Sequence, residues 1–108
     1  MTLTGTCDCG AVSVTVPSRP DRINACPCDY CRRVGARWGY YDEGQAVITG
    51  QTHRYDRATR SVDFHRCARC GTLTHWIGKT PGRIPHMGVH MENFDPADLE
   101  EIPVVIDP

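Results

Sequence analysis

The segment CPCDYC, residues 26–31, places three thiols within six residues. Only one residue separates Cys26 from Cys28. A disulfide favours Cα atoms ~5.5 Å apart and a defined torsion across the sulfurs, so a bond between such close neighbours would be badly strained. A metal ion accepts several closely spaced sulfurs. The segment therefore predicts a metal site. If this is right, the other cysteines of the chain should also have the spacing of metal ligands.

All seven cysteines of the chain fall into three groups. These groups are Cys7 and Cys9, then Cys26, Cys28 and Cys31, then Cys67 and Cys70. Close pairs separated by long stretches of chain are typical of zinc ligands. An odd count argues against a complete set of disulfides. Reduced cysteines that simply fill a core would not explain the grouping.

Composition restricts the classes of protein to consider. The chain has 108 residues, 40% of them hydrophobic, and a net charge of −1. We expect one globular domain, residues 1–108, with no electrostatic case for binding nucleic acid. No apolar run approaches the ~20 residues of a membrane span. Residues 1–10 lack a basic start and an apolar stretch, so we expect no secretory signal and a cytoplasmic location, where disulfides are rare.

Short alternating segments between glycine and proline turns predict an all-β fold. The expected strands are 12–16, 37–41, 46–49, 53–55, 62–65, 73–77, 87–91 and 104–106, with a turn at 58–61 and one helical turn at 96–100. No segment keeps a helical period over the ~10–12 residues that a helix prediction needs.

The seven cysteines divide into a closed site and an open one. A structural zinc takes four protein ligands, and Cys7, Cys9, Cys67 and Cys70 supply them. That site would close a loop of ~60 residues and so restrict the unfolded chain. A glycine follows each pair directly, Gly10 and Gly71, and would let the backbone turn tightly there.

The triplet Cys26, Cys28 and Cys31 keeps three ligands and no fourth cysteine, the pattern of a catalytic zinc with a vacant position. Alternatives stay open. The triplet could serve the first site, could bind no metal and be redox-active, or could be completed by one of five histidines. An open zinc would bind an incoming thiol as thiolate and could polarise a carbonyl. Arg32, Arg33 and Arg37 lie nearby in sequence, either as solvated charges or as partners for substrate carboxylates.

Three motifs together resemble the glutathione-dependent formaldehyde-activating enzyme family, which also includes centromere protein V. They read GTCDCGAV at 5–12, CPCDYCR at 26–32 and CARCGT at 67–72, and they use all seven cysteines. The resemblance implies a β-tent fold of small antiparallel sheets. It implies a structural zinc on the two cysteine pairs and a more weakly held, catalytic-type zinc on the triplet. It also implies the joining of formaldehyde to glutathione as S-hydroxymethylglutathione, classed in reverse as a carbon–sulfur lyase reaction.

Three functions follow as hypotheses. The first is a zinc-dependent enzyme that handles a thiol–aldehyde adduct, with a small-molecule thiol such as glutathione as its partner and a homodimer left open. Its metal would lie on Cys26, Cys28 and Cys31, and its lining residues would be Arg32, Arg33, Trp38 and His65. The second is a non-catalytic zinc module that serves a partner protein. The third is a redox sensor that forms a Cys28–Cys31 disulfide.

Overall fold

The computed structural model describes residues 2–57, 61–82 and 84–107. These residues form two β-sheets, one short α-helix and two 3₁₀ turns. The predicted all-β fold is confirmed. The predicted turn at 58–61 falls largely on residues 58–60, outside the described part of the chain.

The smaller sheet has three strands in the order β1-β2-β5. These strands are β1 (Leu3–Thr6), β2 (Ser13–Val16) and β5 (Val47–Thr49), and both pairings are antiparallel. Val14 and Val16 point into the core, whereas Ser13 and Thr15 are half-exposed. This is the period-2 pattern of a strand with one buried face.

The larger sheet has seven strands in the order β10-β3-β4-β9-β8-β7-β6. Its strands are β3 (Ile23–Asn24), β4 (Trp38–Tyr41), β6 (Thr52–Asp56), β7 (Val62–Cys67), β8 (Leu73–Gly78), β9 (Met87–His90) and β10 (Val104–Val105). Only the pairing of β10 with β3 is parallel. The 3₁₀ turns η1 (Met91–Asn93) and η2 (Pro96–Leu99) connect β9 to β10.

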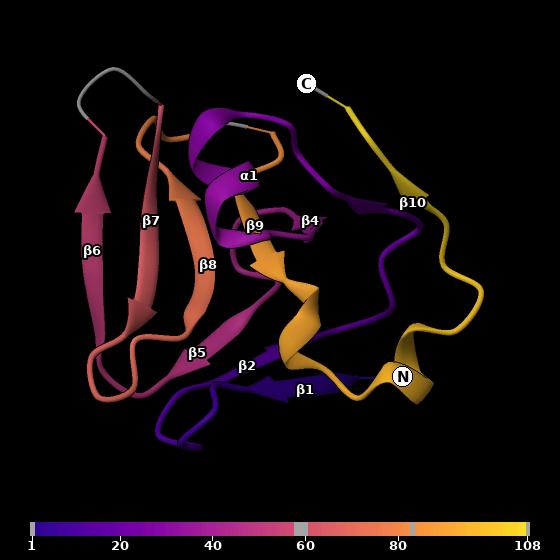
Figure 1. Ribbon diagram of the computed structural model, residues 1–108, viewed down its shortest axis with the longest axis horizontal. Coiled ribbons are helices and arrows are strands. Elements are labelled where there is room, and N and C mark those ends of the chain that lie inside the picture. The colour runs from indigo at the N-terminus through magenta and orange to yellow at the C-terminus, as the bar shows by residue number, and fades with distance from the viewer. Residues whose placement is uncertain (1, 58–60, 83, 108) are drawn as a thin grey trace.

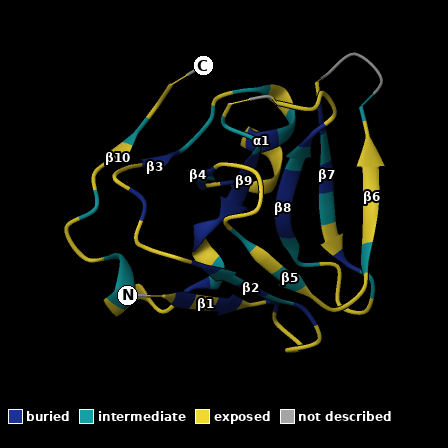
Figure 2. Cartoon of the chain, turned by 180° about the vertical axis from the view of Figure 1, so that it is seen from behind, coloured by how far each residue is buried: buried dark blue, intermediate teal, exposed yellow. Residues whose placement is uncertain are grey.

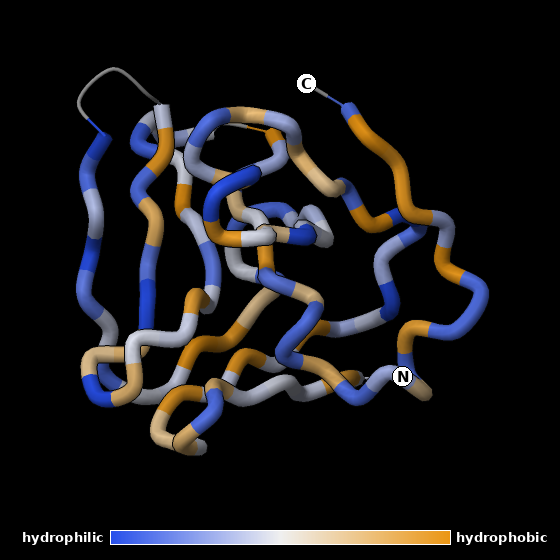
Figure 3. Tube along the Cα trace, viewed as in Figure 1, coloured by the Kyte–Doolittle hydropathy of each residue, from blue (hydrophilic) through white to orange (hydrophobic). Residues whose placement is uncertain are grey.

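The strands of the small sheet lie at the bottom of the view, below β8 and β9 of the large sheet (Figure 1). Burial is deepest in the middle of the large sheet, along β8 and β9, whereas the edge strand β6 is mostly exposed (Figure 2). The same edge strand is hydrophilic along its length (Figure 3). An edge strand with charged side chains resists pairing with other chains.

The core consists of three buried clusters. The largest joins the two sheets and contains Leu3, Val14, Val16, Ile23, Tyr41, Met87, Val89, Met91 and Phe94. The second packs α1 (Asp29–Val34) on the large sheet and contains Cys31, Ala36, Trp38, Val62, Phe64 and Trp76. Cys7, Val12 and Cys67 form the third. Cysteines therefore belong to two of the three clusters, so three of the candidate metal ligands are part of the core.

Several elements differ from the sequence-based prediction. The hydrophobic pattern predicted eight strands and the turn at 96–100, and each has a counterpart within a few residues. It did not predict β1, β3 or α1. The helix has only six residues, too few to show a helical period, and β3 has two.

Candidate metal centres and the adjoining pocket

Cys7, Cys9, Cys67 and Cys70 come together as predicted, with all four sulfurs within 4.8 Å of one another. The Sγ atoms of Cys7 and Cys9 are 3.7 Å apart, and those of Cys9 and Cys67 are 3.8 Å apart. Tetrahedral zinc with Zn–S bonds of about 2.3 Å separates its sulfurs by about 3.8 Å. The spacing fits one tetrahedral ion and is far too long for a disulfide, in which the sulfurs are about 2.05 Å apart.

Two similar turns present these four sulfurs. Gly10 and Gly71 each have φ of +80°, a left-handed conformation that glycine adopts without steric cost. The Gly10 amide donates to the Cys7 carbonyl oxygen and the Gly71 amide donates to that of Cys67. Backbone amides also donate to sulfur, from Val12 to Cys7 at 3.2 Å and from Arg69 to Cys67 at 3.3 Å. Donors of this kind stabilise thiolates and thus favour a cation among them.

One turn follows β1 of the small sheet and the other connects β7 to β8 of the large sheet. A metal ion between them would hold the two sheets together. The two turns also contact directly, because the Asp8 amide donates to the Thr72 hydroxyl. The predicted closed site therefore lies at the junction of the sheets, where it would contribute most to the fold.

The triplet Cys26, Cys28 and Cys31 also converges, with its three sulfurs within 4.8 Å of one another. Its geometry depends on α1. Cys28 is the N-cap residue, and its sulfur accepts the backbone N–H of Cys31 at 3.3 Å. Cys31 lies in the first turn of the helix and is 3% exposed, and its sulfur also accepts the indole N–H of Trp38 at 3.3 Å. The short helix thus folds a run of close cysteines into one cluster.

Burial raises the pKa of the Cys31 thiol, so a thiolate there needs a nearby cation. Three sulfurs of this spacing, with an indole and an amide donor already in place, fit a thiophilic metal ion. Among the described residues, no histidine or carboxylate joins either cysteine group. A metal on the triplet would therefore have three protein ligands from this part of the chain.

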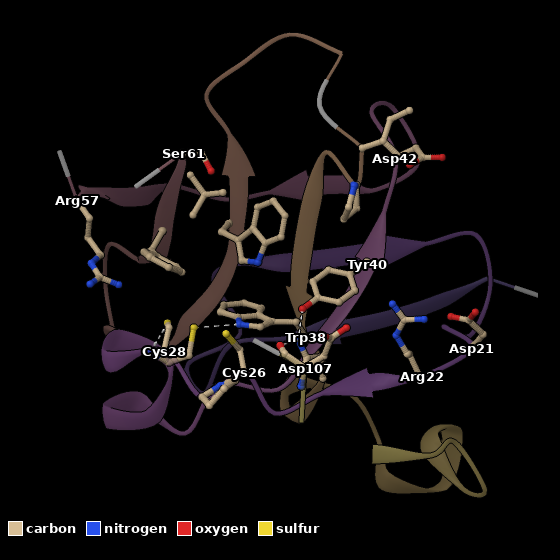
Figure 4. A pocket seen from close by; sticks show the side chains of 18 residues that line it. Asp21, Arg22, Cys26, Cys28, Trp38, Tyr40, Asp42, Arg57, Ser61 and Asp107 are labelled. Atoms are coloured by element: carbon tan, nitrogen blue, oxygen red, sulfur yellow. Dashed lines mark hydrogen bonds between the residues drawn. The ribbon is translucent and has the colours of Figure 1, made fainter. Parts of the chain in front are cut away.

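A pocket of about 810 Å³ adjoins the triplet (Figure 4). Aromatic side chains from three strands of the large sheet form much of its apolar lining: Trp38 and Tyr40 from β4, Phe64 from β7 and Trp76 from β8. Strands β7 and β8 are neighbours, and β9 separates β8 from β4. Phe64 and Trp76 are opposite each other in the register of β7 and β8. A concave site with apolar walls and convergent sulfur ligands can hold a small molecule.

Residues 2–102 match the model of the family described as "Glutathione-dependent formaldehyde-activating enzyme". The chain belongs to this family. A curated Halomonas elongata protein named "Putative glutathione-dependent formaldehyde-activating enzyme" is 33% identical over 89 residues, which are 71% of this chain and 56% of that protein. The chain thus spans only a little over half the length of that relative.

A crystal structure of a Rhodobacter sphaeroides protein has a similar fold, with a TM-score of 0.74 and 28% identity. The similarity covers 95% of this chain and 100% of that one. The family and the fold predicted from the cysteine motifs are therefore confirmed. In the described part of the chain, no helix has the length and apolar character to cross a membrane.

Four residues were predicted to line the substrate site: Arg32, Arg33, Trp38 and His65. Of these, only Trp38 lines the pocket among the described residues. Arg32 and Arg33 are exposed on α1 and contact its own first residue: Arg32 pairs with the Asp29 carboxylate at 3.8 Å, and Arg33 donates to the Asp29 carbonyl. His65 stacks on His75 with ring centroids 4.5 Å apart. Neither the two arginines nor His65 belongs to the pocket lining among the described residues.

The charged side chains in the pocket are others, and sequence reasoning did not find them. Arg22 and Arg57 contribute guanidinium groups, and Asp21, Asp42 and Asp107 also line the pocket. The two arginines are far apart in sequence and lie next to β3 and β6, toward opposite edges of the large sheet. For Tyr40 a signal existed: it is two residues from Trp38 on the same strand and so shares its face.

Proposed function

We propose that this protein is a zinc-dependent enzyme of the carbon–sulfur lyase type that forms and cleaves a thiol–aldehyde adduct, with S-hydroxymethylglutathione as its reference substrate. One observation carries the proposal. The three-cysteine cluster borders a pocket large enough for a small molecule, and no fourth ligand from the described residues closes it. A purely structural site would instead be expected to have four protein ligands.

A zinc ion on the triplet would supply a Lewis acid able to bind a thiol as thiolate. The protein's own residues then position the partners. Trp38 and the α1 backbone hold the cysteine sulfurs. The apolar walls of Trp38, Phe64 and Trp76 would limit the contact of the thiol sulfur and the aldehyde carbon with water. Holding two small reactants together makes their addition effectively unimolecular.

The two guanidinium groups in the pocket support a thiol that carries carboxylates, although Asp21, Asp42 and Asp107 also line it. Arg57 and Arg22 appear at opposite ends of the pocket, with Cys26 and Cys28 between them (Figure 4). The Nη1 atom of Arg57 is buried and has no hydrogen-bond partner in the described structure. A buried guanidinium nitrogen without an acceptor favours an anionic ligand. Glutathione carries a carboxylate at each end with its thiol between them, which suits this arrangement.

Exchange NMR on formaldehyde and glutathione tests the proposal, because the spontaneous reaction supplies its own baseline. We expect zinc-loaded protein to accelerate exchange, and the triple variant Cys26→Ser, Cys28→Ser, Cys31→Ser to lose the acceleration while keeping the metal of the four-cysteine site. If the wild type with two metals bound gives only the spontaneous rate, this substrate pair is rejected and a non-catalytic zinc module is favoured.

A further inference from the structure

We propose that Tyr40 is the hydrogen-bond donor to the oxygen atom of the aldehyde and of its thiol adduct, and that Asn24 sets the direction of this donor. The inference rests on the proposed function. Tyr40 lines the pocket together with the three cysteines, and so does Asn24, which is 3% exposed.

The hydrogen-bond network around Asn24 fixes which way its amide faces. The backbone N–H of Asp107 can only donate, and it donates to Asn24 Oδ1 at 2.9 Å. The backbone carbonyl of Asp107 can only accept, and it accepts from Asn24 Nδ2 at 3.0 Å. The opposite orientation of the amide would place donor against donor and acceptor against acceptor. The oxygen and nitrogen of Asn24 are therefore assigned by their backbone partners.

This assignment decides the role of the Tyr40 hydroxyl. Asn24 Nδ2 has two hydrogens; one goes to Asp107, and the other goes to Tyr40 Oη at 2.5 Å. Tyr40 Oη therefore accepts from Asn24, and its own hydrogen must point elsewhere. No acceptor for that hydrogen is found among the described residues. The O–H is thus available to a ligand in the pocket that Tyr40 lines.

Burial raises the pKa of Tyr40, and the hydrogen bond from Asn24 lowers it in part; the net shift is upward, so the hydroxyl keeps its proton at neutral pH. The indole N–H of Trp38, on the same strand face, cannot take this role because it already donates to Cys31. Among the residues of β4, the donor left for a substrate oxygen is therefore Tyr40.

The step balances without a further reactant. The thiol loses its proton to water, its sulfur bonds to the aldehyde carbon, and the carbonyl π pair moves onto oxygen. The oxygen then takes a proton from water, so no net proton is consumed. Tyr40 would donate to that oxygen as negative charge develops on it. Removing one such donor typically lowers kcat by about 10²–10³-fold.

The test compares Tyr40→Phe with Tyr41→Phe in zinc-loaded protein. Tyr41 is the neighbouring residue, but its hydroxyl donates to the Ser18 carbonyl and does not line the pocket. We expect Tyr40→Phe to lower kcat by about 100-fold with KM for glutathione unchanged, and Tyr41→Phe to keep wild-type kcat. Asn24→Asp cannot donate to Tyr40, so it should lower kcat similarly and add nothing in the Tyr40→Phe background.

A second measurement does not need catalysis. Formaldehyde and glutathione form their adduct spontaneously, so it can be added to protein carrying ¹³Cζ-tyrosine. We expect the Tyr40 Cζ resonance, assigned by its loss in Tyr40→Phe, to shift on adduct binding, whereas the Tyr41 resonance stays.

Each outcome decides the proposal. Equal kcat for Tyr40→Phe and Tyr41→Phe in an active enzyme would overturn the role of Tyr40 and leave the proposed function standing. If the wild type is inactive, the proposed function fails and the NMR result decides: a Tyr40 shift supports the hydrogen bond, and an unmoved resonance with adduct bound overturns it.

Discussion

Trp38 donates its indole N–H to the sulfur of Cys31 in a buried hydrogen bond, with 3.3 Å between Nε1 and Sγ. Trp38 is on β4 and Cys31 is on α1, so this bond fixes the helix against the sheet through the sulfur of a proposed metal ligand. The same tryptophan forms part of the pocket wall. One residue thus connects the helix, the proposed metal ligand and the substrate space.

Trp38→Phe removes this donor and keeps an aromatic ring. We expect zinc affinity at the triplet to fall about 10- to 100-fold, the usual effect of losing a hydrogen bond to a metal ligand. Competition with a chromophoric chelator measures it. The four-cysteine site in the same molecule is the internal control, and an equal loss of affinity at both sites would contradict the prediction.

Cys70→Ser and Cys26→Ser should have unequal effects on stability. Cys70 belongs to the site that joins the two sheets, and structural zinc contributes about 10–16 kcal/mol of binding free energy to small domains. We expect Cys70→Ser to lower Tm by more than roughly 10 °C, and Cys26→Ser to lower it by only a few degrees. Calorimetry with metal quantitation checks this. A Cys26→Ser variant as unstable as Cys70→Ser would make the triplet structural.

Gly88→Ala should disturb the pocket wall. A Cβ atom at Gly88 would lie 2.1 Å from Nε1 of Trp76, so the indole must move. Overpacking of this kind costs about 1–3 kcal/mol. We expect weaker binding of glutathione as well as lower stability in urea. In a Trp76→Leu background, Gly88→Ala should lower the free energy of unfolding by at least about 1 kcal/mol less than it does in the wild type. Additive effects of the two changes would argue against the clash.

His75 should make folding sensitive to acid. It is 2% exposed, and burial lowers its pKa to about 3 from a usual 6.5. The unfolded chain therefore binds a proton near pH 6.5 that the folded chain refuses, so stability falls as the pH drops below that value. One such group removes about 1.4 kcal/mol between pH 7.5 and pH 5.5. Burial lowers the pKa of His65 and His90 too, with the same sign.

The check is urea unfolding of His75→Phe at several pH values with saturating zinc. We expect a shallower decline in the free energy of unfolding than for wild type. His53→Phe is the matched control, because His53 is exposed on β6. A decline in His75→Phe as steep as in both other proteins would refute the assignment.

Arg57→Gln should raise KM for glutathione, because it removes a guanidinium whose Nη1 atom is buried and has no hydrogen-bond partner in the described structure. Hydrogen bonds between charged groups contribute about 1.5–3 kcal/mol, or roughly 10- to 100-fold in KM. For the neutral thiol 2-mercaptoethanol we expect little change. Arg32→Gln is the control, since Arg32 is exposed on α1. If Arg32→Gln raised KM and Arg57→Gln did not, carboxylate recognition would lie on the helix instead.

The cysteine spacing alone predicted the two sulfur clusters, because close pairs and a triplet restrict what those side chains can reach. Cys7 and Cys67 are distant in sequence, yet their grouping followed from the tetrahedral requirement of zinc. Gly10 and Gly71 were predictable for the same reason, since a tight turn beside each pair requires a left-handed residue. The alternation of apolar and polar residues, between glycine and proline turns, predicted most of the strands.

The pocket lining followed from tertiary structure. Proximity in sequence suggested Arg32 and Arg33, but the helix that gathers the triplet turns these side chains to solvent. Arg22, Arg57 and Tyr40 reach the pocket through the order of strands in the large sheet, which no local pattern encodes. Likewise, Asn24 and Asp107 meet only because β10 pairs with β3. The sequence determined where the sulfurs gather, since ligand spacing is local chemistry; the fold decided which groups surround them, since strand pairing brings together residues far apart in the chain.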